Sequence, residues 1–142
     1  MPRTLGEHVR KRRLELRLTQ KDAAVRLDVS PWTVLNWEKR HTEPPIESMP
    51  AIIRFLGYNP FPEPTNIPER LLAKRRAMGW SIEDAAGQLG VDAGTWGAWE
   101  CGQLILHQGH REMVARILWL TPEEIHREMQ NRRNRSRRLL PT

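Results

Sequence analysis

The sequence contains one cysteine, Cys101, and no long apolar stretch. A single cysteine excludes a disulfide framework and a cysteine-based metal cluster. No apolar run approaches the roughly 20 residues that a membrane-spanning helix needs, and the basic residues near the N-terminus are not followed by the apolar segment of a signal peptide. These absences predict a protein of a bacterial-type cytoplasm with no membrane partner.

Residue patterns typical of catalysis are also lacking. The sequence has no glycine-rich phosphate loop, no nucleophile elbow and no paired carboxylates in an evident cleft. His107 and His110 are close in sequence, but two ligands are fewer than the three or four that a zinc site uses. The sequence therefore predicts no enzymatic activity, no metal and no cofactor.

Positive charge is in excess, and it is unevenly distributed along the sequence. The formal net charge of +6 divides into +4 over residues 1–62, −3 over residues 63–125 and +5 over residues 126–142. A polyanion should prefer the first block and the arginine-rich tail, and avoid the middle. The tail alone is ambiguous, because such a segment binds nucleic acid in some proteins and only aids solubility in others.

The first block contains two short predicted helices joined by a tight turn, with the sequence TQKDAAVRLDVSPWTVLNWEKR over residues 19–40. Thr19 and Asp22 have the spacing of a capping box at the start of the first helix. Ser30 can cap the second helix, and Pro31 suits its first position because no N–H is needed there. This pattern is that of a helix-turn-helix, whose second helix enters the DNA major groove.

Flanking segments complete a small helical domain. Thr4 and Glu7 suggest a capping box for a first helix, whose buried side would come from Val9, from Leu14 or the neighbouring Arg13, and from residues 16–18. A closing helix is expected over about residues 47–56. Residues 58–66 contain three prolines, which favour a stiff, extended linker.

The chain then repeats itself at an offset of 62 residues. The matches fall at helix caps and apolar positions, which favours a tandem duplication. Thr121 and Glu124 predict one more capped helix that could continue past Met129. The predicted domains are residues 1–57, which read DNA, a linker over 58–66, a degenerate second copy over 67–130 and a basic tail over 131–142.

The sequence resembles the Cro-repressor/XRE family of helix-turn-helix domains. The resemblance covers about residues 5–57 well and residues 67–120 more loosely. It implies an all-α fold of two tandem five-helix domains joined by the proline-rich linker. The residues that carry the resemblance are Arg13, Leu18-Thr19-Gln20, Ala24, Leu27, Val29-Ser30, Val34 and Trp37-Glu38.

The resemblance also implies a binding site for double-stranded DNA. Gln20 would hold a phosphate and brace the recognition helix, Ser30–Arg40, whose outward residues would meet base edges. Two arginine–glutamate pairs, Arg13 with Glu38 and Arg75 with Glu100, would be structural. The expected DNA-binding residues are Gln20, Ser30, Trp32, Thr33, Asn36, Lys39, Arg40 and Thr42.

The second copy lacks most of these groups. Ile82 stands in the place of Gln20, small residues replace the outward side chains of the recognition helix, and Cys101 and Gly102 replace Lys39 and Arg40. We hypothesise that this copy has lost most DNA contact. It could instead serve packing or homodimerisation, through the repeat itself or through the C-terminal helix.

The resulting prediction is a sequence-specific DNA-binding protein, a transcriptional regulator associated with the nucleoid. One alternative is a protein-interaction adaptor for a polymerase, a toxin or another partner, which the exposed Trp32 would suit. Another is a built-in pseudo-dimer whose two copies both read DNA, in major grooves about 34 Å apart. The weak second recognition helix argues against the pseudo-dimer.

Overall fold

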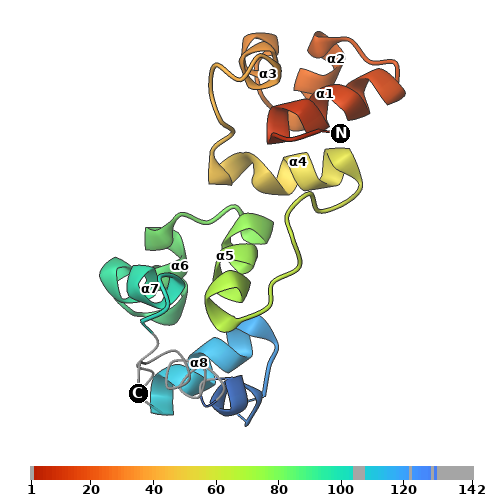
Figure 1. Cartoon of the computed structure of the whole chain (residues 1–142). Coiled ribbons are helices and arrows are strands. Elements are labelled where there is room, and N and C mark those ends of the chain that lie inside the picture. The colour runs from red at the N-terminus through yellow and green to blue at the C-terminus, as the bar shows by residue number, and fades with distance from the viewer. Residues whose placement is uncertain (1, 104–107, 122, 129, 131–142) are drawn as a thin grey trace, which may run out of the picture. The chain divides into compact units, whose positions relative to one another are not determined.

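The computed structural model describes residues 2–103, 108–121, 123–128 and 130, and this part of the chain is helical without strands (Figure 1). The chain divides into two compact units, Met1–Glu63 with Arg76–Ser81, and Pro64–Arg75 with Ile82–Thr142. The elements are α1 (Leu5–Glu15), α2 (Gln20–Leu27), α3 (Pro31–Glu38), the 3-10 turn η1 (Ile46–Ser48), α4 (Met49–Leu56), α5 (Ile67–Met78), α6 (Ile82–Leu89), α7 (Ala93–Glu100) and α8 (Gln108–Leu118).

The helix-turn-helix consists of α2 and α3, and both helices begin where the sequence predicts them. The recognition helix is shorter than the predicted Ser30–Arg40, because α3 ends at Glu38 and Arg40 has a left-handed backbone. Thr19 and Asp22 make the complete capping box at the start of α2. The turn after α2 passes through Asp28, which has a left-handed backbone with φ of 57°. Ser30 then caps α3 by accepting a hydrogen bond from the backbone N–H of Thr33, with Pro31 as the first helical residue.

The core of the first unit lies between α1, α2, α3 and α4. Small residues at the centre of α2 let the helices approach closely, and Trp37 fills the space beside them. On α1 the structure decides between the two alternatives: Leu14 is 54% exposed, and the Arg13 side chain turns inward. The buried cluster contains Val9, Ala23, Ala24, Leu27, Val34, Trp37, Ile52, Phe55 and Leu56.

The start of α1 packs directly on the end of α3. A Cβ atom added to Gly6 would lie 1.8 Å from the carbonyl oxygen of Trp37 and 3.2 Å from the backbone nitrogen of Glu38. Only glycine fits such a close approach of two backbones. This contact fixes the end of α3 against α1.

Two other local predictions needed correction. Thr4 caps α1, but the carboxylate of Glu7 accepts its short bond from the backbone N–H of Arg3, so the cap differs from the predicted reciprocal box. The closing segment is not one helix from residue 47. It divides into η1 and α4, with Pro50 in the first turn of α4, where proline is tolerated. Residues 58–66 contain no helix or strand.

The second unit has its own core, formed from α5 to α8 and a short helical segment over residues 123–128. Thr121 and Glu124 cap that segment reciprocally. On α8, Met113 is 41% exposed, whereas Ala115 is buried. Met129 and the tail over 131–142 lie outside the described residues. The buried residues are Ile67, Leu71, Ala85, Ala86, Trp96, Trp99, Val114, Ala115 and Ile125.

Helix positions in the two units agree at the offset of 62 residues. The bounds of α6 and α7 equal those of α2 and α3 shifted by 62. The cap of α5 also resembles that of α1, because the side chain of Asn66 accepts from the backbone N–H of Glu69 while the carboxylate of Glu69 accepts from that of Thr65. The duplication remains our proposal, for which these agreements are the support.

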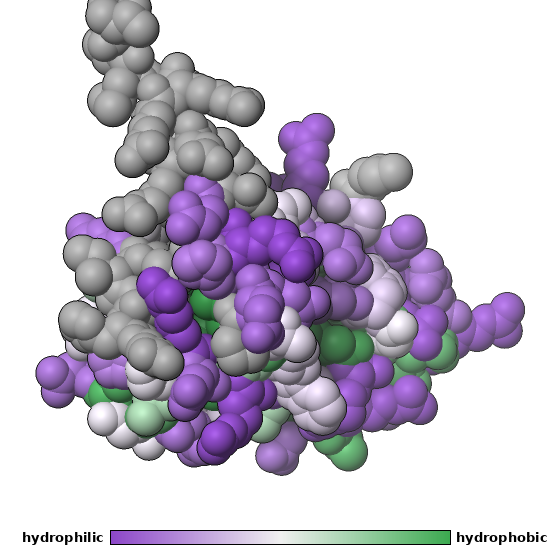
Figure 2. All heavy atoms as spheres, turned by 90° about the horizontal axis from the view of Figure 1, so that it is seen from below, coloured by the Kyte–Doolittle hydropathy of each residue, from purple (hydrophilic) through white to green (hydrophobic). Residues whose placement is uncertain are grey.

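No helix in the described residues is both long and apolar enough to cross a membrane. On the face drawn in Figure 2, hydrophilic residues predominate among the coloured atoms and apolar residues form small, separate patches.

Candidate nucleic-acid interface

The outer face of α3 presents the residues that the sequence places at base edges. Trp32 is 69% exposed, while Thr33 and Asn36 are half-buried. The hydroxyl groups of Ser30 and Thr33 are 2.9 Å apart and hydrogen-bond to each other. The Thr33 methyl group, together with the remaining capacity of its hydroxyl, is what this residue can offer to a base.

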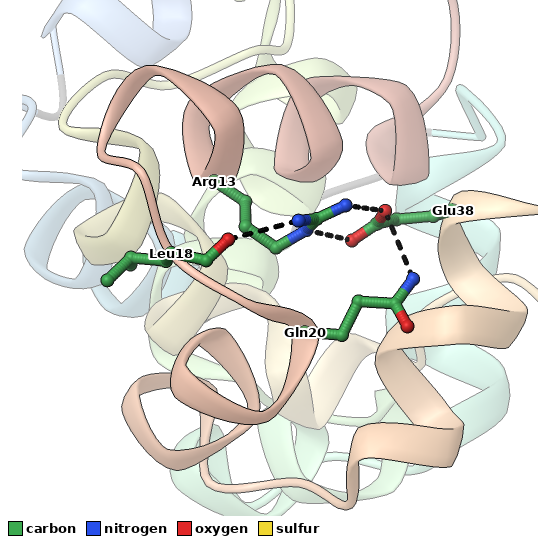
Figure 3. A network of polar contacts seen from close by, with 4 residues as sticks. All are labelled: Arg13, Leu18, Gln20 and Glu38. Carbon is green, nitrogen blue, oxygen red and sulfur yellow. Dashed lines mark hydrogen bonds and ion pairs between the residues drawn. The ribbon is translucent and has the colours of Figure 1, made fainter.

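A network of polar contacts braces the other end of α3 (Figure 3). The Arg13 guanidinium donates to both carboxylate oxygens of Glu38, at 2.9 and 2.8 Å, and also to the carbonyl oxygen of Leu18, at 3.0 Å. The Gln20 amide points at the same carboxylate, at 3.5 Å. These contacts tie together α1, the turn before α2, the start of α2 and the end of α3.

Burial strengthens the central pair. The Arg13 and Glu38 side chains are 12% and 4% exposed, so water screens them little. The hydrogen bonds that Arg13 donates to the Glu38 carboxylate raise the pKa of Arg13, which keeps this guanidinium charged. The pair therefore sets the position of α3 and leaves no free charge for DNA.

A cavity of about 300 Å³ opens beside this network, lined by residues of α1, α2 and the end of α3. The side chains of Arg10 and Lys39 at its rim are exposed and make no hydrogen bond or ion pair within the described residues. Two cations and the Gln20 amide around one opening suit an oxyanion such as phosphate. The lining residues are Arg10, Arg13, Gln20, Leu35, Glu38 and Lys39.

Beyond α3, the chain continues through Lys39, Arg40 and Thr42. Arg40 forms an ion pair with Glu7, whose carboxylate oxygen lies 3.1 Å from the guanidinium, and its side chain is 62% exposed. Such an exposed pair contributes little stability, so Arg40 can exchange its partner for a phosphate. Thr42 is exposed, with no side-chain hydrogen bond in the described part of the chain.

The structure thus brings Gln20 and Lys39 together around one cavity, with Arg40 following directly. It places Ser30, Trp32 and Thr33 at the opposite end of α3. Arg10 was not among the expected site residues. Its position one helical turn before Arg13 could have indicated that both side chains lie on the same side of α1.

The equivalent network in the second unit is satisfied differently. Arg75 binds both carboxylate oxygens of Glu100, at 2.5 and 2.9 Å. The third donor is the indole N–H of the buried Trp96, whereas the first unit uses Gln20. The Glu100 carboxylate is therefore bound from inside the core. No polar side chain is needed at the position of Ile82, which corresponds to Gln20.

Fold and site together define a helix-turn-helix unit with an exposed second helix. A family model described as Helix-turn-helix matches residues 9–61, so the chain contains a helix-turn-helix domain there. No curated protein and no solved structure matches the chain. The second unit lies outside the matched residues.

Proposed function

We propose that the first unit binds double-stranded DNA sequence-specifically, as a transcriptional regulator. The observation that carries this proposal is the exposed face of α3 beside a basic cavity, on a helix whose end is fixed by the Arg13–Glu38 pair. The match to the helix-turn-helix family supports it. In this arrangement Trp32, Thr33 and Asn36 meet base edges, and phosphates bind at Gln20, Lys39 and Arg40.

The roles of the two groups separate in a selection experiment. Duplexes are selected from a random pool with the wild-type protein, and binding to the selected and to unselected sequences is measured over a salt series. Asn36→Ala should lower the preference for selected sites, because an amide to adenine contact carries specificity. Arg40→Ala should weaken binding to all duplexes alike and reduce the salt dependence. Equal effects of both variants on every duplex would contradict these roles.

We also propose that the second unit makes little contact with DNA and serves packing or homodimerisation. Support comes from the carboxylate of Glu100, bound by Arg75 and Trp96 rather than by a surface amide. Full-length protein with Gln20, Lys39 and Arg40 all changed to Ala should lose specific DNA binding. Specific binding that survives in this variant would assign a reading role to the second unit. Sedimentation of the wild type tests the dimer.

A second candidate function is protein docking through the same helix-turn-helix. Val25 on α2 and Trp32 on α3 are 78% and 69% exposed, and large exposed apolar side chains often mark protein interfaces. In that case Trp32→Ala would abolish capture of a partner protein and leave DNA binding unchanged. If Trp32 meets DNA instead, the same variant weakens binding to the selected duplex.

A further inference from the structure

The turns of the two units use left-handed residues at equivalent positions. Eight residues in the described part of the chain have a positive φ, and they form pairs separated by 62 residues. The residues at these positions differ between the units. The pairs are Arg17 and Gly79 (56° and 72°), Asp28 and Gly90 (57° and 67°), Arg40 and Gly102 (61° and 94°), and Gly57 and Trp119 (77° and 60°).

Arginine is an unfavourable residue at such a position. In the left-handed region a Cβ atom crowds the following carbonyl group, which glycine avoids and which aspartate tolerates better than arginine. The second unit forms the same turns with Gly79 and Gly102. Arg17 and Arg40 therefore occupy positions where glycine would give the more stable backbone.

Contacts within the protein do not account for Arg17. Its side chain is exposed and makes no hydrogen bond or ion pair within the residues that the structure describes. Arg40 has a partner in Glu7, but the Arg40 side chain is itself 62% exposed. Strained residues retained without structural benefit point to a function.

The position of Arg17 suggests which function. It precedes Leu18, whose carbonyl oxygen is held by the same Arg13 guanidinium that binds Glu38. Gln20 follows Arg17 at the third position along the chain, so their Cα atoms lie within about 11 Å of each other. Arg17 is thus three residues before Gln20, and Arg40 directly follows Lys39; both Gln20 and Lys39 line the basic cavity.

We propose that Arg17 is a further DNA-binding residue, which contacts a backbone phosphate beside the phosphate held near Gln20 and Lys39. The proposal rests on the DNA-binding function of the first unit. Arg17 and Arg40 are retained in strained turns because a guanidinium there neutralises phosphate charge, often with two parallel hydrogen bonds. The second unit, which makes little DNA contact, has glycine at both positions.

Arg17→Gly tests this proposal because its two expected effects have opposite signs. Measured on full-length protein, the variant should bind selected and random duplexes about 3–10-fold more weakly. The slope of log affinity against log salt should fall by about one. Its melting temperature should rise by a few degrees, because the strain is removed. Arg17→Lys retains the charge and should bind within about threefold of the wild type.

Two variants separate backbone strain from charge. Asp28→Gly relieves a turn of nearly the same φ without removing a cation, so it should raise the melting temperature with no loss of affinity. Arg54→Gln removes an exposed cation from a cavity that α4 forms with α1 and α2, without α3. It should leave DNA affinity within about twofold of the wild type, since its cation lies away from the bound phosphates.

The outcomes distinguish this inference from the proposed function. If the wild type binds duplex DNA and Arg17→Gly binds equally well, or loses no more than Arg54→Gln, the inference is overturned and the function stands. A lower melting temperature for Arg17→Gly would overturn the argument from strain. Absence of DNA binding by the wild type would overturn both proposals.

Discussion

Replacing Glu38 with glutamine removes the charge that balances a buried arginine. Arg13 is only 12% exposed and loses its strongest partner, which it binds at 2.9 and 2.8 Å. Breaking one side of a buried ion pair typically costs about 3–5 kcal/mol, because the remaining charge is left uncompensated. Glutamine retains one acceptor oxygen, and the carbonyl of Leu18 still accepts from Arg13, so we expect about 3 kcal/mol. That is a large share of a typical stability of about 5–15 kcal/mol.

Urea denaturation of the full-length protein measures this loss as a lower midpoint at an unchanged m value. Glu100→Gln is the matched variant, because Arg75 and Glu100 are similarly buried at 11% and 13% exposure. The double variant Arg13→Met/Glu38→Leu should recover most of the lost stability, since it removes both charges together. A loss under about 1 kcal/mol for Glu38→Gln, or no recovery in the double variant, would refute the reasoning.

Three other predictions follow from particular contacts. Gly6→Ala should destabilise the first unit by about 1–3 kcal/mol or more and weaken DNA binding, because its Cβ would lie 1.8 Å from the Trp37 carbonyl oxygen; an unchanged urea midpoint would contradict this. Thermal stability should fall as the pH drops through the acidic range, because backbone hydrogen bonds lower the pKa of Glu7 and Glu69 from 4.5 and that of Asp22 from 3.8. The stability that these carboxylates contribute is present above their ordinary pKa values and is lost as the pH falls through their lower pKa values in the folded protein. Melts that do not change down to about pH 3 would argue against it. Trp96→Phe should cost about 1–3 kcal/mol, because it removes the donor to Glu100 and leaves a small void, and Ile82→Gln should restore part of the loss; no rescue would show that the two donors are not equivalent.

The elements predicted best from the sequence are those fixed by local chemistry. Both helices of the helix-turn-helix were predicted from residue spacing alone, because their N-terminal signals contact only residues in the same helical turn. These residues are Thr19, Asp22, Ser30 and Pro31.

Features that depend on packing between helices could not be predicted in this way. Periodicity on α1 left Leu14 and Arg13 as alternatives, and the carboxylate of Glu38 on a distant helix decides between them. The donor role of Trp96 depends on its indole N–H lying against the Glu100 carboxylate in the packed core. Left-handed turns at Arg17 and Arg40 carry no signal in residue type, because arginine rarely adopts that conformation.

The candidate interface was predictable in part. The sequence placed Trp32 and Asn36 on α3, but the cavity that joins Arg10 to Gln20 and Lys39 appears only when α1 packs against α3. The ion pair between Arg40 and Glu7 likewise joins segments that are far apart in the sequence.

The central claim is that the exposed face of α3 binds duplex DNA. Its most direct test is hydroxyl-radical footprinting of the full-length protein on a duplex selected from a random pool. We predict protection of the backbone sugars that flank one major-groove segment per first unit, lost in the Asn36→Ala/Arg40→Ala double variant. A footprint that survives in that double variant, or no footprint on any selected duplex at low salt, would contradict the account.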